Sequence, residues 1–230
     1  NLTKNKPKSL VKIDKKKRLI DKVIENFENL GFKKTTIITG YKSDHFKEFK
    51  KIKKIKNRKW KTTNIFGSLI CANKLLTKNQ CIISYADILY EKDAIEILNK
   101  SKIKKGIIIL SYMHWKKYWK ERFNNPLSDL ETFLTNGKNQ LVEIGNRTNS
   151  YKDIKGQYMG VFKIDPNSWQ KIKKHLFKNV KDLNKIDITA LFQLIIKKKI
   201  CDIYVLEYKK KWFEIDNIKD YKVLKKSVEN

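Results

Sequence analysis

Two carboxylates follow short hydrophobic stretches at distant points of this chain of 230 residues. Asp87 comes after the segment CIISYA, and Asp216 closes the segment KWFEI. Two carboxylates brought together from distant strands can hold Mg²⁺, which takes few carboxylates and fills its other positions with water and phosphate oxygens. The pair therefore indicates metal-assisted phosphate chemistry at the end of a sheet, where ligands of open α/β domains bind.

Each acid also has a purely structural explanation, because Asp is favoured at the first position of a helix. Asp87 could cap a helix that begins near Glu91, and Asp216 could cap one that begins near Asn217. For Asp87 alone the two explanations weigh equally, and for Asp216 alone the cap is favoured. Only the two acids together favour a metal site.

Lys8, directly after Pro7, is a third candidate, since a lysine held in place could set its charge against a transferring phosphate. The alternative is that Lys8 is one surface lysine among many. The chain has 53 Lys and Arg residues against 24 Asp and Glu, a formal charge of +29. The distribution of this charge must therefore be considered before a role is given to any one lysine.

The positive charge does not indicate a nucleic-acid partner. It is nearly all lysine, although arginine is the usual residue for bidentate recognition of phosphate and guanine. The lysines form no single basic block and are expected to be solvated surface. The few arginines are Arg18, Arg58, Arg122 and Arg147.

Other features exclude further classes of protein. No segment approaches the ~18 apolar residues of a membrane span, and the opening NLTKNKPKSL lacks the apolar core of a secretion signal. The three cysteines are odd in number and far apart, which favours reduced thiols, and the three histidines are scattered. We therefore expect a cytoplasmic protein without a membrane partner and without a metal site built on His or Cys.

Hydrophobic segments of strand and helix type alternate along the chain, which is typical of a layered α/β domain. At this length one domain is expected over residues 1–230. The region 115–155 is less regular, and we interpret it as an acceptor-side insertion over the sheet edge. Strands are expected at 8–13, 34–40, 81–85, 106–113, 156–164, 201–208 and 211–216. Helices are expected at 17–31, 64–76, 91–101, 166–177 and 187–199, and near the C-terminus, with a helix or loop over 43–56.

Seven segments, in this order, resemble the sugar-phosphate-type nucleotidyltransferases, particularly the cytidylyltransferases that act on phosphocholine or 2-aminoethylphosphonate. The resemblance spans essentially the whole chain. It implies a three-layer, Rossmann-like α/β fold with a mostly parallel mixed sheet. The segments are LTKNKPKSLVKI, TTNIFGSLICA, IISYADILY, RFNNPLSDLETF, VEIGNRTNSYKDIKGQYMGVFKI, DITALFQLII and WFEID.

The resemblance also implies a reaction and its cofactor. A nucleotidyl group would pass from a nucleoside triphosphate, CTP being favoured, to a small phosphate or phosphonate, and pyrophosphate would leave. Asp87 and Asp216 match the Mg²⁺ ligands of the family, and Lys8 matches the lysine near the nucleotide phosphates. Such catalysis depends on positioning and charge neutralisation rather than on covalent chemistry by side chains.

Other matching positions imply the two substrate sides. Thr63, Asn64 and Ser68 match the nucleotide-binding segment; the alternative is an ordinary helix N-cap with a packed helix behind it. Asp129, Glu131 and Tyr158 match the acceptor side, where they would meet a cationic amine. A quaternary ammonium group could stack on a tryptophan there, but for each candidate plain core packing is the better explanation. These candidates are Trp119, Trp169 and Trp212.

The chain departs from the family pattern in two respects. The family begins with a strand and a glycine-rich loop of the kind LAAGxGxR, whose amides cradle the triphosphate, and the sequence starts at Asn1 without either. We therefore expect the full-length protein to be the enzyme and a chain beginning at Asn1 to be inactive or poorly folded. Ala86 also stands where glycine is usual before the metal-binding acid.

Two alternatives remain open at this stage. One is a sugar-1-phosphate nucleotidyltransferase that uses another nucleoside triphosphate. The other is a noncatalytic binding domain that kept the fold and lost the glycine-rich loop. A homo-oligomer is compatible with the sequence, which decides neither the acceptor nor the oligomeric state.

Overall fold

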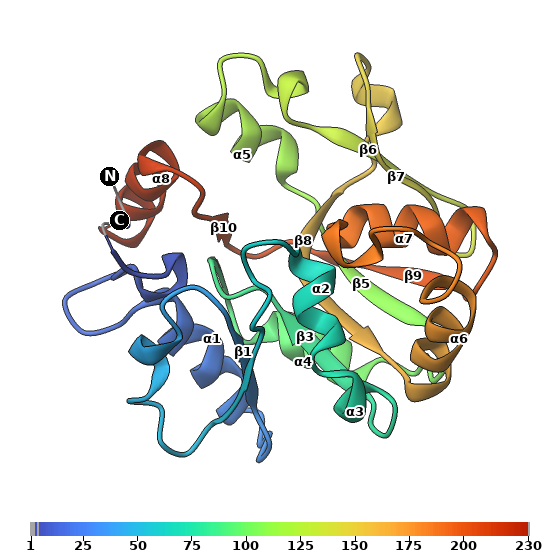
Figure 1. Ribbon diagram of the computed structural model, residues 1–230. Helices are drawn as coiled ribbons and strands as arrows, with labels where there is room; N and C mark the ends of the chain where they lie inside the picture. Colours follow the sequence, from blue (N-terminus) through green and yellow to red (C-terminus); the bar gives the residue numbers. More distant parts are fainter. Residues whose placement is uncertain (1–2, 4, 230) are drawn as a thin grey trace.

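The computed structural model describes residue 3 and residues 5–229, so Leu2 and Lys4 of the segment LTKNKPKSL lie outside the described residues. Its central sheet has the order β3 (Cys81–Ser84), β8 (Gln157–Ile164), β5 (Ile107–Tyr112) and β9 (Ile203–Tyr208) (Figure 1). β5 and β9 are parallel, and β8 runs antiparallel to both of its neighbours. The sheet is therefore mixed, as expected.

Helices cover both faces of this sheet. Alternate residues of β5 point to opposite faces, so that Ile107 and Ile109 lie in one core and Ile108 and Leu110 in the other. One core includes residues of α1 (Leu19–Glu28) and α4 (Asp93–Lys100). The other includes residues of α2 (Ile65–Ile70), α3 (Asn73–Leu76), α6 (Pro166–Leu176) and α7 (Ile188–Lys197). These two helical layers confirm the predicted three-layer fold.

A small two-stranded sheet stands beside the central one. β4 (Ile88–Tyr90) pairs antiparallel with β10 (Trp212–Glu214), and Glu214 lies opposite Ile88. The amide of Ile215 donates a hydrogen bond of 3.1 Å to the carbonyl oxygen of Asp87. This pairing places the residues just before β4 next to those just after β10. α8 (Ile218–Glu229) follows β10.

The prediction of a strand over residues 8–13 is wrong. Residues Lys8–Leu10 form a single 3-10 turn, in which the amide of Leu10 donates to the carbonyl of Pro7. Its hydrophobic residues do not lie in a sheet, because Leu10 is buried against α1. The region 43–56 begins as a 3-10 turn at Ser43–Phe46 and ends as β2 (Lys53–Lys56), which pairs parallel with β1 (Thr36–Thr39).

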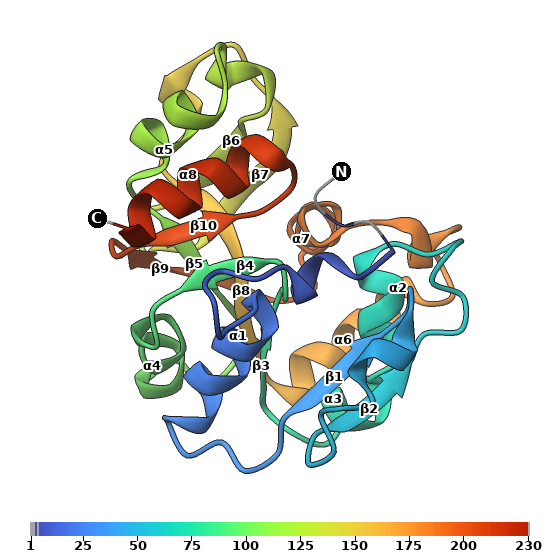
Figure 2. The same cartoon turned by 90° about the vertical axis from the view of Figure 1, so that its left-hand side faces the viewer.

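The irregular region between β5 and β8 forms an excursion from the sheet, as Figures 1 and 2 show. It contains α5 (Trp115–Arg122) and the antiparallel hairpin of β6 (Glu131–Thr135) and β7 (Leu141–Arg147). β7 packs on α7, and Gln140 forms a bridge to Tyr204 of β9. Within the described ranges, no helix is long and apolar enough to span a membrane.

Gly160 of β8 occupies a backbone conformation that the sheet needs. It has φ +79°, and the register between β5 and β8 shifts at this point, as in a β-bulge. A Cβ atom there would lie 2.9 Å from the ring of Tyr85. We expect Gly160→Ala to lower the free energy of unfolding by about 1–3 kcal/mol, measured by chemical denaturation. Gly137→Ala is the control, since its Cβ would meet nothing within 4 Å, and an equal loss there would contradict the explanation.

Candidate active site

Lys8, Asp87 and Asp216 meet at one point, although they come from three distant parts of the chain. The Nζ atom of Lys8 lies 2.8 Å from Oδ1 of Asp216 and 3.3 Å from Oδ2 of Asp87. Asp87 is placed by the end of β3, and Asp216 by the end of the paired β10. The structure therefore brings together the three residues that the sequence indicates for phosphate chemistry.

The helix-cap explanation is wrong for both acids. Asp87 leads into β4, and α4 begins only at Asp93, without a side-chain cap. At the start of α8 it is Asn217 that accepts hydrogen bonds from the amides of Lys219 and Asp220, at 2.7 and 3.2 Å. The carboxylates of Asp87 and Asp216 are thus both directed to the lysine.

Arg122 is a buried member of this site that sequence reasoning missed. Its guanidinium contacts three carboxylates: Asp220 at 2.8 Å, Glu214 at 3.3 Å and Asp216 at 3.3 Å. Its side chain is only 2% exposed. Two signals in the sequence mark it: arginine is scarce in a chain so rich in lysine, and Arg122 opens the segment RFNNPLSDLETF.

The carboxylates repel one another across a partly desolvated site. Burial, and then the negative charge of Asp216, raises the pKa of Asp87 above its usual range, although Lys8 opposes the shift. Burial and the charge of Asp216 likewise raise the pKa of Glu214 to about 7, against the opposing effect of Arg122. Burial alone would lower the pKa of Lys8, but its hydrogen bond to Asp216 and the charge of Asp87 raise it. A further cation bound at this point would therefore reduce the repulsion between the carboxylates.

The residues present fit a Mg²⁺ ion. The ammonium group of Lys8 bridges Asp87 and Asp216, which shows that the two carboxylates converge on the position of one cation. In the part of the chain that the structure describes, no group of three or more His, Cys, Asp or Glu side chains is arranged to hold a metal. Two carboxylates suffice for Mg²⁺ when water and phosphate oxygens complete its octahedron. The assignment of Asp87 and Asp216 as its ligands remains a prediction.

The pKa of Glu214 predicts a pH effect on stability. In the unfolded chain this carboxyl group ionises near 4.5, and in the folded protein near 7. The native state therefore binds more protons between these values, and the free energy of unfolding falls as the pH rises through this range. Thermal unfolding without divalent cations should show this slope for the wild type and a smaller slope for Glu214→Gln. Equal slopes would contradict the assigned pKa.

The three candidate nucleotide-side residues have local structural roles. The buried Asn57 donates hydrogen bonds from its Nδ2 atom to the hydroxyls of Thr63 and Ser68, at 2.8 and 3.0 Å. The Oδ1 atom of Asn64 accepts from the amide of Ile65 at the start of α2. The structure thus supports the ordinary helix start for these residues. A contact of any of them with nucleotide remains a prediction.

Two of the candidate acceptor residues lie in or next to the β6–β7 hairpin. Asp129 accepts a hydrogen bond of 2.9 Å from the indole of Trp119. Burial, and then the charge of Asp187, raises the pKa of Glu131, although Arg147 opposes the shift. Asp187, which the sequence analysis did not single out, caps α7 through a bond of 2.7 Å from the amide of Ala190.

Two tyrosines connect this acidic region to the metal candidates. The pKa of Tyr85 is raised first by burial and then by the charges of Asp187, Asp87, Glu214 and Glu131. Its phenol therefore lies within electrostatic reach of both groups of acids. The neighbouring ring of Tyr158 makes an edge contact with Tyr85, and its buried hydroxyl has no hydrogen-bond partner among the described residues.

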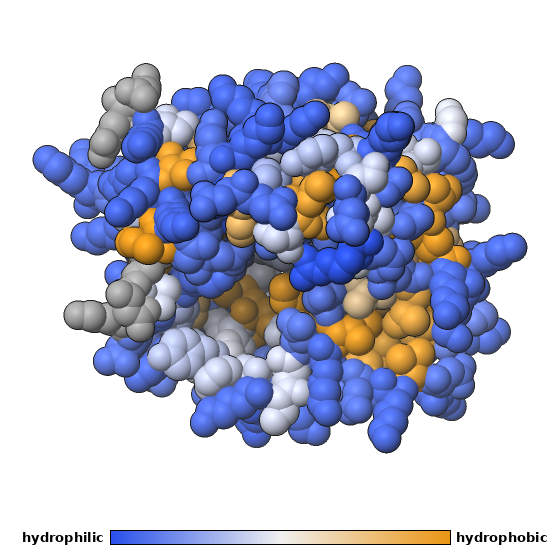
Figure 3. All heavy atoms as spheres, turned by 90° about the horizontal axis from the view of Figure 1, so that it is seen from above, coloured by the Kyte–Doolittle hydropathy of each residue, from blue (hydrophilic) through white to orange (hydrophobic). Residues whose placement is uncertain are grey.

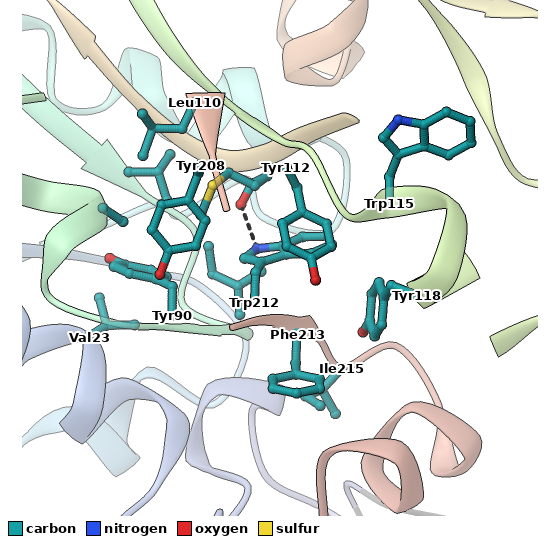
Figure 4. Close-up of a cluster of buried hydrophobic side chains, with 14 of the residues drawn as sticks. Val23, Tyr90, Leu110, Tyr112, Trp115, Tyr118, Tyr208, Trp212, Phe213 and Ile215 are labelled. Carbon is teal, nitrogen blue, oxygen red and sulfur yellow. Dashed lines mark hydrogen bonds between the residues drawn. The ribbon is translucent and has the colours of Figure 1, made fainter. Parts of the chain in front are cut away.

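Core packing explains the position of the tryptophans. Trp169 packs against Phe66 and Phe177 in the core that contains α6 and is fully buried. Trp212 is almost fully buried, and its indole donates to the carbonyl of Met159, the bond that Figure 4 shows as a dashed line. Trp119 is also buried.

Figure 3 shows a hollow in one face of the molecule, with hydrophobic atoms in its floor and mainly hydrophilic ones around it.

A three-layer fold in which a lysine and two carboxylates converge is the arrangement that the resemblance to nucleotidyl-transferring proteins predicts. The chain belongs to the nucleotidyl transferase family, whose model matches residues 1–123. It is 30% identical over 239 aligned residues to the CTP:phosphoglutamine cytidylyltransferase of Campylobacter jejuni, which covers 96% of this chain and 92% of that protein. The predicted resemblance to the cytidylyltransferases is thereby confirmed.

Solved structures confirm the fold at low sequence identity. The CTP:phosphocholine cytidylyltransferase of Streptococcus pneumoniae has a TM-score of 0.68 at 19% identity, over 99% of this chain and 92% of that one. A putative glucose-1-phosphate thymidylyltransferase of Bacillus anthracis has 0.74 at 13%, over 98% and 87%. The inositol-1-phosphate CTP transferase of T. maritima has 0.68 at 17%, over 91% and 82%.

Proposed function

We propose that this protein transfers a cytidylyl group from CTP to a phosphate or phosphonate oxygen of a small acceptor and releases pyrophosphate. The observation that carries the proposal is the convergence of Lys8, Asp87 and Asp216 on one cation position. The choice of CTP is supported by the similar proteins of C. jejuni, S. pneumoniae and T. maritima, whose names all specify CTP.

The chain's own residues would position the reaction and neutralise its charge. Asp87 and Asp216 would hold Mg²⁺, which when bound offsets the negative charge that develops on the phosphate oxygens. Lys8 would exchange its contacts with the carboxylates for contacts with the nucleotide phosphates. The acceptor oxygen is already ionised near neutral pH, so no side chain has to take its proton. The new bond forms at the α-phosphorus, and the bond to the leaving pyrophosphate breaks.

The acidic region suits an acceptor with a positive or hydrogen-bond-donating end. Glu131 and Asp187 approach each other closely enough for the charge of Asp187 to raise the pKa of Glu131. A bound amine or amide would relieve that repulsion. An amino-alkyl phosphate, an amino-alkyl phosphonate or a phosphorylated amide such as phosphoglutamine fits this description.

A sugar-1-phosphate nucleotidyltransferase is the second candidate, which the fold shared with the B. anthracis protein favours. A noncatalytic binding domain is disfavoured by the 30% identity to a cytidylyltransferase over 96% of this chain.

A substrate panel tests the proposal. The protein is made as its gene encodes it, with whatever precedes Asn1, and pyrophosphate release is followed for CTP, UTP, dTTP, GTP and ATP in Mg²⁺. The acceptors are phosphocholine, 2-aminoethylphosphonate, phosphoglutamine, glucose 1-phosphate and inositol 1-phosphate. We expect release with CTP and a nitrogen-bearing acceptor and its loss on chelation of Mg²⁺. Preference for another nucleotide with glucose 1-phosphate would support the second candidate, and no release with any pair would sink both.

A further inference from the structure

Arg122 links the acceptor-side excursion to the carboxylates of the candidate active site. It is the last residue of α5, and its three carboxylate partners all follow or lie within β10 and α8. Its guanidinium also lies 5.1–5.3 Å from the ring centroids of Tyr118, Trp119 and Phe123. Ion pairs and aromatic rings thus fix this side chain on several sides.

The two cations that contact Asp216 differ in mobility. Lys8 contacts Oδ1 with a flexible side chain that is 36% exposed, and Arg122 contacts Oδ2 from a buried position. An arriving phosphate could draw Lys8 away, because a lysine carries a point charge on a flexible stem. Arg122 has no comparable freedom. One oxygen of Asp216 would then be released while the other stayed bound.

Further contacts hold the segment of Glu214 and Asp216 against α5. The hydroxyl of Tyr118 accepts from the amide of Glu214 at 3.0 Å and donates to its carbonyl at 3.2 Å. Asp220, paired with Arg122, accepts from the amides of Asp216 and Asn217 at 2.9 and 3.1 Å. The backbone around Asp216 is therefore held by Tyr118 of α5 and by Asp220 of α8, which pairs with Arg122 of α5.

The same helix reaches the acceptor side. The ring of Trp119, which Arg122 contacts, stacks on Trp212 with centroids 6.0 Å apart, and its indole donates to Asp129. One continuous series of contacts thus runs from Asp129 through Trp119 and Arg122 to Asp216. Every side chain in the series is packed or hydrogen-bonded to the next.

We propose that Arg122 is a positioning residue that holds Asp216 in the orientation required for the divalent cation and couples it to the acceptor side through α5. The inference rests on the proposed function. Residues that orient metal ligands in this way change metal affinity or activity by about 10–100-fold when they are replaced.

The test compares Arg122→Met with Arg58→Met, which removes an exposed arginine that forms no ion pair among the described residues. Loss of Arg122 alone would leave the carboxylate of the buried Asp220 without its ion-pair partner. The double variant Arg122→Met/Asp220→Asn removes that unpaired charge, and the amide oxygen of Asn can still accept the backbone hydrogen bonds that Asp220 accepts. Arg122→Lys retains the positive charge but lacks the planar guanidinium group that can bind several carboxylates at once. Binding of Mn²⁺ in the presence of the nonreacting analogue α,β-methylene-CTP is followed by electron paramagnetic resonance, and thermal unfolding is recorded in parallel.

We expect the Mn²⁺ dissociation constant to rise about tenfold in the double variant, with an intermediate rise in Arg122→Lys and none in Arg58→Met. The turnover number should fall by a similar factor. The KM for CTP should stay within about threefold, since the guanidinium group of Arg122 pairs with carboxylates of the protein and is not proposed to contact the nucleotide. Added guanidinium chloride at millimolar concentration should restore part of the Mn²⁺ affinity, a result that general destabilisation would not give.

The inference about Arg122 would be overturned if the double variant folded and bound Mn²⁺ as tightly as the wild type. Release of pyrophosphate by the wild type would show that the proposed function stands in that case. The inference would also be overturned if Mn²⁺ affinity fell but the turnover number did not. Failure of the wild type to turn over any nucleotide would instead count against the proposed function. Binding and turnover therefore separate the two conclusions.

Discussion

Asp87→Asn is expected to lower pyrophosphate release from CTP by about a thousandfold, equivalent to ~4 kcal/mol of transition-state stabilisation. An amide has the shape of the carboxylate but lacks the charge that pairs with Lys8 and that the proposed function requires for a divalent cation. The stability of the folded protein should not fall, because burial and the charge of Asp216 disfavour the ionised form of Asp87 and raise its pKa. The unfolding temperature of the variant should therefore equal or exceed that of the wild type at neutral pH.

Steady-state assays and thermal unfolding of the same samples check both parts of this prediction. Asp44→Asn is the matched control, because Asp44 is exposed and pairs only locally with Lys47. Activity close to wild type in Asp87→Asn would remove it from the metal site. A large fall in unfolding temperature would show that Asp87 has a structural role instead.

Trp212→Ala is expected to lower the free energy of unfolding by about 3–5 kcal/mol, the usual cost of deleting a large buried aromatic side chain. Trp212 is 2% exposed and contacts the rings of Tyr112, Tyr118 and Trp119. Figure 4 shows it in the buried cluster with the two tyrosines. Its indole also holds β10 to β8 through the carbonyl of Met159. The loss is a large part of the ~5–15 kcal/mol typical of a domain.

Activity should fall with stability in this variant, because β10 carries the chain into Asp216. Urea denaturation measures the first effect, and assays well below the unfolding midpoint measure the second. Trp60→Ala is the control, since Trp60 is only partly buried and packs against Tyr41 outside this cluster. An effect no larger than that of Trp60→Ala would show that the cluster is not a principal source of stability.

Much of the fold could be predicted because its signals are local. The continuous hydrophobic segments of β5 and β8 are typical of strands covered on both faces, and helical periodicity marked α1, α6 and α7. The pairing of β4 with β10 could not be predicted, since each has only three residues and the partners are far apart in the chain. Residues 8–13 have the composition of a strand, but tertiary contacts decide that Leu10 packs against a helix.

The candidate site divides in the same way. Asp87 and Asp216 could be found because an acid after a hydrophobic strand is visible in the sequence. The decision between Asp216 and its neighbour Asn217 as the cap of α8 turns on one residue, which no pattern resolves. Arg122 and Asp187 were missed because their partners depend on how α5 and α7 pack against remote segments.

The distance in sequence between Lys8 and Asp216 has a consequence for when their contact can form during synthesis of the chain. Lys8 and Asp216 are 208 residues apart, and synthesis of that length at about 5–20 residues per second takes on the order of ten seconds or more. The last helix also returns to the beginning of the chain, where Tyr221 donates to the carbonyl of Lys12 and Leu224 joins Val11 and Ile13 in the core. Lys8 can therefore meet Asp216 only after β10 and the segment that follows it have been made and have docked.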